Sequence, residues 1–147
     1  MARRRKKRVE EPLTEELLEE LLSSPDPDSF IRNHSLEERS LKDYLQTMLE
    51  KKGLRRIDVI HQAGLNETHG YQIFQGTRKA SRDKLIALAF AMGLDQTETR
   101  RLLKAGGVNE LYPKTRRDAI ILFCLDHGCT LQKANEELYR LKEETIS

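Results

Sequence analysis

The chain has 147 residues, which is room for one compact domain of about 100 residues with extensions. Apolar residues make up 37%, charged residues 34% and aromatic residues only 5%, with no Trp, which indicates one modest aliphatic core under a charged surface. The sequence has no apolar run long enough for a transmembrane helix, and no apolar segment follows the basic N-terminus, so we expect neither membrane insertion nor secretion. The two cysteines, Cys124 and Cys129, favour a reducing, cytoplasmic setting without disulfides.

The formal net charge of +2 conceals an uneven distribution along the chain. Residues 1–8 carry six Arg or Lys side chains, residues 9–40 have a net charge of −8, residues 41–112 have +4, and residues 113–147 are neutral. A basic tail attracts polyanions without sequence preference, although such runs are also often simply solvated. The pattern predicts an appended arm on a weakly basic body.

Leucines at helical spacing predict a short first helix over residues 13–22, with Thr14 as its cap. The apolar stripe consists of Leu17, Leu18, Leu21 and Leu22. Ten residues are marginal as an isolated helix, so the stripe must dock on its own domain, on a protein partner or on a second copy. Two prolines between Ser23 and Asp28 then indicate a linker.

Four helices are predicted in the next part of the chain. One begins at Ser35, which has capping-box spacing to Glu38, buries a stripe at Leu41, Tyr44, Leu45, Met48 and Leu49, and ends before Gly53. The others cover about residues 56–63, with Ile57, Val59, Ile60 and Ala63 inward; residues 67–75, capped by Asn66 and closed by Gly76; and a segment capped by Ser81 with a stripe at Leu85, Leu88, Ala89 and Met92. Gly64 supplies the turn between the second and third of them.

Three further helices complete an all-α prediction, because no segment alternates with period two over strand length. The first follows a capping box at Asp95 and Glu98, the second covers residues 115–127, and the third is capped by Thr130. We divide the chain into a basic tail with an acidic helical arm and linker (1–34), a central domain (35–107) and a C-terminal helical pair for packing or dimerisation (108–147).

The segment from Leu41 to about Leu103 resembles the lambda-repressor-like, or XRE-type, helix-turn-helix domain. The match consists of Val59 to Asn66, where a buried pair precedes a turn glycine, an apolar residue and a cap, and of Ile73 to Arg78, where a helix ends at glycine before basic residues. It covers 60 to 65 residues and is one of spacing more than identity. We take it to predict a helix-turn-helix bundle with an N-terminal arm and two extra C-terminal helices.

The resemblance implies a sequence-specific transcriptional regulator that binds double-stranded DNA as a two-fold homodimer, with the 67–75 helix in the major groove. By matching positions, the base-reading residues would be Glu67, Thr68, His69, Tyr71 and Gln72. The phosphate contacts would be Arg55, Arg56, Thr77, Arg78, Lys79 and Arg82. The resemblance implies no cofactor.

Some positions depart from the family pattern and support an alternative function. Gly70 replaces a buried aliphatic residue, Phe74 a glutamate and Arg56 a glutamine, and Glu67 is acidic where phosphates would lie. We expect Gly70 to remove a core contact and Tyr71 to tilt into the space. The alternative function is a protein–protein adaptor that keeps the scaffold without reading DNA, with the acidic N-terminal helix as the surface for a protein partner.

The C-terminal helices are the expected dimer surface, although core packing is the simpler role for Ile120 and Phe123. Asn135 and Tyr139, one turn apart, could form an interface edge. We predict no enzyme, because His34, His61, His69 and His127 lack metal-ligand spacing. Cys124 is interpreted as a core thiol, and Cys129, beside Gly128, is expected to be more exposed but has no evident base. Asp118, next to Arg116 and Arg117, is interpreted as a surface ion pair or a cap contact.

Overall fold

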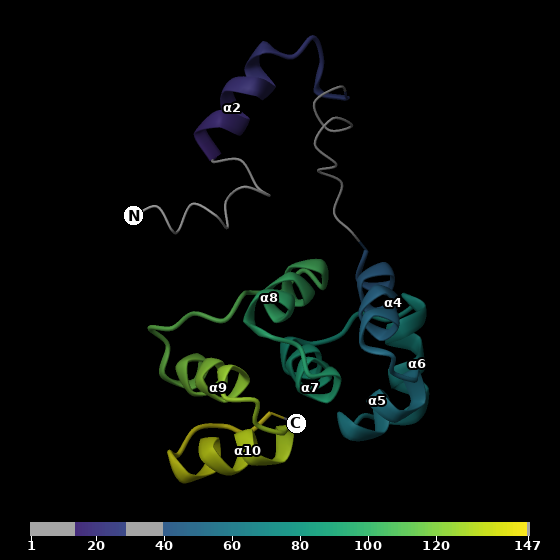
Figure 1. The fold of residues 1–147 in the computed structure, drawn as a ribbon, viewed down its shortest axis with the longest axis vertical. Coiled ribbons are helices and arrows are strands. Elements are labelled where there is room, and N and C mark those ends of the chain that lie inside the picture. The colour runs from purple at the N-terminus through teal and green to yellow at the C-terminus, as the bar shows by residue number, and fades with distance from the viewer. Residues whose placement is uncertain (1–13, 29–39, 147) are drawn as a thin grey trace. The chain divides into compact units, whose positions relative to one another are not determined.

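The computed structural model describes residues 14–28 and 40–146, which form eight α-helices and, within these ranges, no strand (Figure 1). The helices are α2 (Thr14–Ser23), α4 (Leu41–Lys52), α5 (Arg56–Gln62), α6 (Glu67–Gln75), α7 (Arg82–Met92), α8 (Gln96–Ala105), α9 (Arg116–Asp126) and α10 (Leu131–Arg140). The predicted all-α class is confirmed. None of these helices is long and apolar enough to cross a membrane. The chain divides into two units, residues 1–38 and 39–147.

Four helices of the second unit begin at the caps that the sequence predicted. The side chains of Asn66, Ser81, Asp95 and Thr130 each accept a hydrogen bond from the backbone N–H three residues later, at 3.0, 3.3, 2.7 and 3.0 Å. Each bond satisfies one of the amide groups that the first turn of a helix leaves without an internal partner. The reciprocal bond from the Asp95 N–H to Glu98 completes the predicted capping box.

The start of α4 differs from the prediction. Its cap is Ser40, which has extended backbone geometry and accepts a hydrogen bond from the Asp43 N–H at 3.1 Å. The helix therefore begins at Leu41, where its apolar stripe also begins. The proposed capping box at Ser35 and Glu38 lies outside the described residues.

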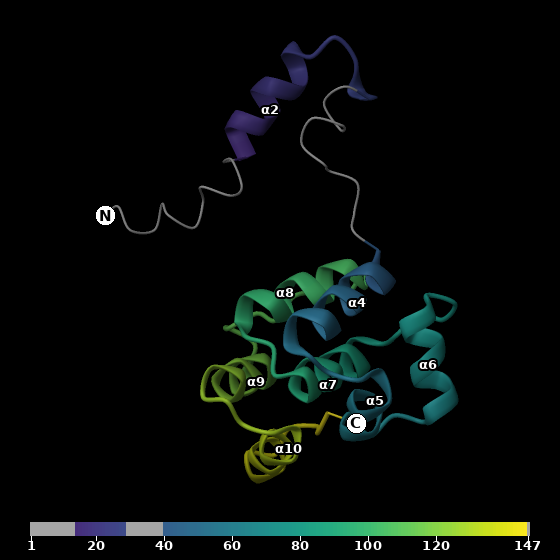
Figure 2. The ribbon, with the colours of Figure 1, turned by 45° about the vertical axis from the view of Figure 1, so that its right-hand side comes forward.

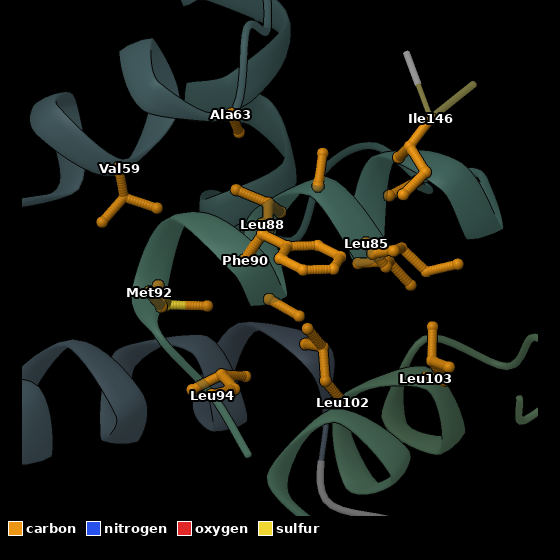
Figure 3. Packing of buried hydrophobic residues seen from close by; sticks show 14 of the residues in the cluster. Val59, Ala63, Leu85, Leu88, Phe90, Met92, Leu94, Leu102, Leu103 and Ile146 are labelled. Atoms are coloured by element: carbon orange, nitrogen blue, oxygen red, sulfur yellow. The ribbon is translucent and has the colours of Figure 1, made fainter. Parts of the chain in front are cut away.

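Helix α7 is the central element of the second unit. It packs against α4, α5, α8 and α10, and in Figure 2 it lies between them. The predicted stripe of Leu85, Leu88, Ala89 and Met92 is buried, but so are the residues between, from Leu85 to Phe90. Figure 3 shows the side chains of neighbouring helices gathered around those of α7. A helix enclosed on several sides has no polar face, which is why its apolar residues run consecutively.

The C-terminal helices share this core. Ile121 of α9, Leu138 of α10 and Ile146 beyond α10 are fully buried in the same cluster as the residues of α7. Residues 39–147 are accordingly one unit, with the pair α9–α10 packed as part of it. Phe123 differs from the expected core role, because its side chain is 60% exposed and stacks on His127 with ring centroids 3.9 Å apart.

A buried carboxylate joins α4 to α8. Glu98 accepts hydrogen bonds from Lys51 at 2.7 Å and from the Asp95 N–H, and Lys52 lies 3.1 Å from its other oxygen. Burial by itself would raise the pKa of Glu98, but the hydrogen bonds and the two lysine charges outweigh it and lower that pKa to about 2. The Tyr44 hydroxyl adds a bond of 2.9 Å to the Glu98 carbonyl.

Helix α2 belongs to the first unit and matches the predicted span within one residue at each end. Its Leu18, Leu21 and Leu22 side chains are all exposed, Leu22 by 75%. These three leucines of the predicted stripe are therefore exposed in the described part of the chain, and the docking expected for the stripe stays a prediction.

Candidate functional site

Helix α6 is held rigidly at both ends and against α5. Gly64 has a φ of +73°, which turns the chain sharply between the two helices, and Gly76 ends α6 at a φ of +83°. Gly70 faces α5, where a Cβ at this position would lie 2.6 Å from Cγ2 of Ile60. The expectation that Gly70 leaves a space for Tyr71 is wrong, because Ile60 occupies that space and the two helices approach closely.

Two of the five residues predicted to read bases contact α5 instead of standing free. The carboxylate of Glu67 lies 2.9 Å from Nε2 of His61. The ring of Tyr71 lies under the guanidinium of Arg56, at 4.8 Å from Arg56 Cζ to the ring centroid, a cation–π arrangement. Thr68 is exposed on the first turn of α6, and Gln72 is partly exposed one turn later. Thr68 and Gln72 are therefore the solvent-accessible residues of the predicted base-reading set whose side chains are not bonded to α5.

The residues predicted to bind phosphate fall into two groups. Arg78 and Lys79 follow α6 directly and are exposed, and neither has an ion-pair or hydrogen-bond partner among the described residues. Arg55 is exposed but forms an ion pair with Asp58 at 2.9 Å, and the Thr77 hydroxyl donates to the Gln72 carbonyl at 3.3 Å. Of these residues, those with an unpaired charge in the described part of the chain are Arg78 and Lys79, just after the C-terminal end of α6.

Arg82 forms internal contacts that we did not predict from the sequence. Its guanidinium donates to both oxygens of the buried Asp118, at 3.1 and 2.6 Å, and to the carbonyls of Asn109 and Glu110. Asp118 also accepts the Tyr112 N–H at 2.9 Å. Burial alone would raise the pKa of Asp118, but these bonds and the Arg82 charge lower it. Four of the five N–H donors of the Arg82 guanidinium make these bonds and are not available to a phosphate. Asp118 is buried and is therefore not a surface ion pair.

A second arginine–aspartate pair runs in the opposite sense between the same two helices. Arg117 of α9 donates to both oxygens of Asp83 at 3.1 Å, and also to the carbonyls of Glu144 and Thr145. The first turns of α7 and α9 are therefore joined by two bidentate pairs, and the C-terminal segment is tied to the same cluster. The only signal in the sequence is an Arg-Asp dipeptide near the start of each helix, at 82–83 and 117–118.

A cavity of about 610 Å³ lies beside α6. Its walls come from the α5–α6 turn, α6, the loop at Arg78, the first half of α7, and α10 with the C-terminal segment. The Asn135 amide bridges to the backbone of Ile146, donating to its carbonyl at 3.0 Å and accepting its N–H at 2.6 Å, which holds that segment in the wall. Asn135 is thus an internal residue, whereas Tyr139, which we grouped with it, is 80% exposed.

His69 carries a polar atom that nothing in the described residues satisfies. Its Nε2 is buried and has no hydrogen-bond partner, while the residue lines the cavity. Burial, followed by the nearby charges of Lys84 and Arg78, lowers the pKa of His69 below its usual value, so the ring is neutral at pH 7. A neutral imidazole can donate or accept a hydrogen bond at this atom, depending on its tautomer.

The remaining groups considered in the sequence are the cysteine thiols and possible metal ligands. Cys124 is buried, as expected, and burial raises the pKa of its thiol to about 11. Among the residues that the structure describes, no group of three or more His, Cys, Asp or Glu side chains could hold a metal ion.

Comparison with protein-family models, with curated proteins and with solved structures gives no match for this chain.

Proposed function

We propose that the chain is a sequence-specific DNA-binding regulator of the helix-turn-helix type, in which α6 enters the major groove. The observation that carries the proposal is a short helix, capped at both ends, that is followed by two exposed cations, Arg78 and Lys79. Neither cation has an ion-pair partner within residues 14–28 and 40–146. An α-helix fits the major groove, and cations at its end neutralise phosphates. The resemblance of residues 41–103 to the lambda-repressor-like pattern supports the same assignment.

Within this proposal, Thr68 and Gln72 read bases, because neither side chain is bonded to another described residue and both stand on one face of α6, four residues apart. Glutamine can pair with N6 and N7 of adenine. Arg56, Glu67 and Tyr71 act mainly through the α5–α6 contacts described above, and Arg55 acts through its ion pair with Asp58 at the start of α5. The exposed rings of Phe123 and Tyr139 support α9 and α10 as the surface of a two-fold dimer acting in the cytoplasm.

The test is selection of bound sequences from a random double-stranded DNA library, followed by titration at two salt concentrations. Gln72→Ala should cost about 1–3 kcal/mol on the selected site and relax preference at one base pair. Arg78→Gln should weaken binding to all sequences alike and reduce the salt slope by about one. Arg100→Gln on α8 removes the same charge at an exposed position away from α6 and should change neither quantity.

Recovery of no motif, or equal effects of Gln72→Ala and Arg78→Gln on selected and random DNA, would refute base reading by α6. The adaptor alternative then gains weight. It is favoured by the pairing of Glu67 with His61 and of Tyr71 with Arg56, which use groups on α6 for internal contacts. Its distinguishing result is a protein, retained from an extract by the wild-type chain, whose binding is lost on substituting Thr68 but not Arg100.

A further inference from the structure

The cavity beside α6 is lined by side chains of two chemical kinds. Thr68, His69 and Gln72 are polar, and Arg78 and Lys84 are cations. Ala87, Leu131 and Ile146 are among its apolar lining residues. A volume of about 610 Å³ is in the range of pockets that bind small molecules.

The charge inside the cavity is positive once internal pairs are considered. Of the described residues that line it, Asp83 is the only acid, and both of its oxygens are already bound by Arg117 at 3.1 Å. Arg78 and Lys84 have no ion-pair partner in the described part of the chain. His69 also lines the cavity, within reach of the charges of Lys84 and Arg78. Its buried Nε2 has no hydrogen-bond partner among the described residues, whereas such atoms normally have one in a folded protein.

Hydrogen bonds hold the C-terminal segment in the wall of the cavity. Ile146 is fully buried, and its backbone is held on both sides by Asn135. The residue before it is held by Arg117, which donates to the Thr145 carbonyl at 3.1 Å. The C-terminal segment therefore stays in place beside α6 and completes the cavity.

We propose that this cavity binds a small organic anion, with a carboxylate or phosphate head between Arg78, Lys84 and His69 and a short apolar body against Ala87, Leu131 and Ile146. Thr68, Gln72 and Arg78 belong both to the cavity wall and to the DNA-contacting set. Bound anion and bound DNA therefore exclude each other, and by linkage each lowers the affinity for the other. This exclusion rests on the proposed DNA-binding function, whereas binding of the anion does not.

The first experiment titrates the full chain with octanoate, octyl phosphate and uncharged octan-1-ol, using calorimetry and the NMR resonances of the His69 ring. Octanoate or octyl phosphate should bind and shift those resonances, and the comparison identifies the preferred head group. Lys84→Gln should weaken binding at least fivefold. Lys104→Gln, which removes the same charge from an exposed position on α8, should change it less than twofold. Circular dichroism melting verifies that both variants are folded.

Binding of octan-1-ol as tight as that of the two anions, or an equal loss in Lys84→Gln and Lys104→Gln, would overturn the anion site. So would the absence of binding by all three compounds.

The second experiment repeats the titration of the selected DNA with and without saturating octanoate. Weaker DNA binding in its presence supports exclusion, and unchanged DNA affinity with octanoate bound refutes it while leaving the anion site in place. If octanoate binds and no DNA does, the proposed function fails and the cavity assignment stands. These outcomes separate the two proposals.

Discussion

At position 70 helix propensity and tertiary packing favour different residues. Glycine inside a helix costs about 1 kcal/mol relative to alanine, so helix propensity alone favours replacement. In the folded protein, however, a Cβ on Gly70 would lie 2.6 Å from Cγ2 and 2.9 Å from Cγ1 of Ile60. The close approach of α5 and α6 therefore depends on the absence of a side chain here.

We predict that Gly70→Ala destabilises the fold by about 1–3 kcal/mol, the usual cost of overpacking, despite its better helix propensity. Thermal and urea unfolding measure the change. The matched background is Ile60→Ala, which removes Cγ1, Cγ2 and Cδ1, the three atoms that the new Cβ would meet. In that background Gly70→Ala should be neutral or stabilising. An equal loss in both backgrounds would show that Ile60 is not the obstacle.

Arg78 and Arg82 show how the same side chain takes different roles four residues apart. Arg78 is exposed and unpaired among the described residues, whereas Arg82 binds Asp118 and two carbonyls of the loop before α9. Removing one partner of a buried ion pair leaves an uncompensated charge, which is strongly destabilising.

We predict that Arg82→Gln lowers the free energy of unfolding by about 3 kcal/mol, since Asp118 then keeps only its bond from the Tyr112 N–H. Arg78→Gln should leave stability within about 0.5 kcal/mol, as expected for an exposed position. Urea unfolding of both variants measures the contrast. Similar stability of the two variants would contradict the structural role of Arg82.

At the scale of elements, the buried acids Glu98 and Asp118 join helices that are far apart in the chain. Glu98 of α8 pairs with Lys51 and Lys52 of α4, and Asp118 of α9 pairs with Arg82 of α7. The partly exposed Asp83 of α7 adds a second pair, with Arg117 of α9. Buried pairs of this kind fix which face of one helix meets another, because any other arrangement leaves a charge without a partner.

The Glu98 contact predicts a defined dependence of stability on pH. Its folded pKa of about 2 lies below the unfolded value of 4.5, so the stabilisation is complete above pH 4.5 and is lost as the pH falls toward 2. A difference of this size corresponds to about 3 kcal/mol. Glu98→Gln should unfold more readily at pH 7 and lose less stability between pH 5 and 2.

The control for this measurement is Glu110→Gln, which removes a carboxylate from an exposed position. Its acid unfolding curve should follow that of the wild type. Wild-type acid sensitivity in Glu98→Gln would contradict the assigned role of the carboxylate.

At the scale of the whole molecule, α9 and α10 belong to the unit that contains α6. Residues 39–147 form this unit, and the core residues Ile121, Leu138 and Ile146 lie in it. The C-terminal segment contributes a wall of the cavity and is joined to α7 by Arg117. A boundary between residues 107 and 108 would cut through this shared core.

We predict that residues 39–147 alone unfold in one cooperative transition within about 3 °C of the melting temperature of the full chain, because their core is complete without residues 1–38. A chain ending at residue 107 should lose cooperative unfolding, since it exposes the apolar surface of α7 that α10 covers. Scanning calorimetry distinguishes the cases. Cooperative melting of residues 39–107 at the full-chain temperature would contradict the single core.

The sequence by itself determined where most helices begin and end, because caps such as Asn66 and Asp95 act on amides only three residues away. It also indicated the buried stripe of α7 and the exposed cation Arg78. Only the tertiary structure decided that Arg82 faces Asp118, that Ile60 packs against Gly70, and that His69 and Ile146 line the same cavity. These contacts join positions far apart in the chain or on different helices. They depend on how helices pack, which local hydrogen bonding does not specify.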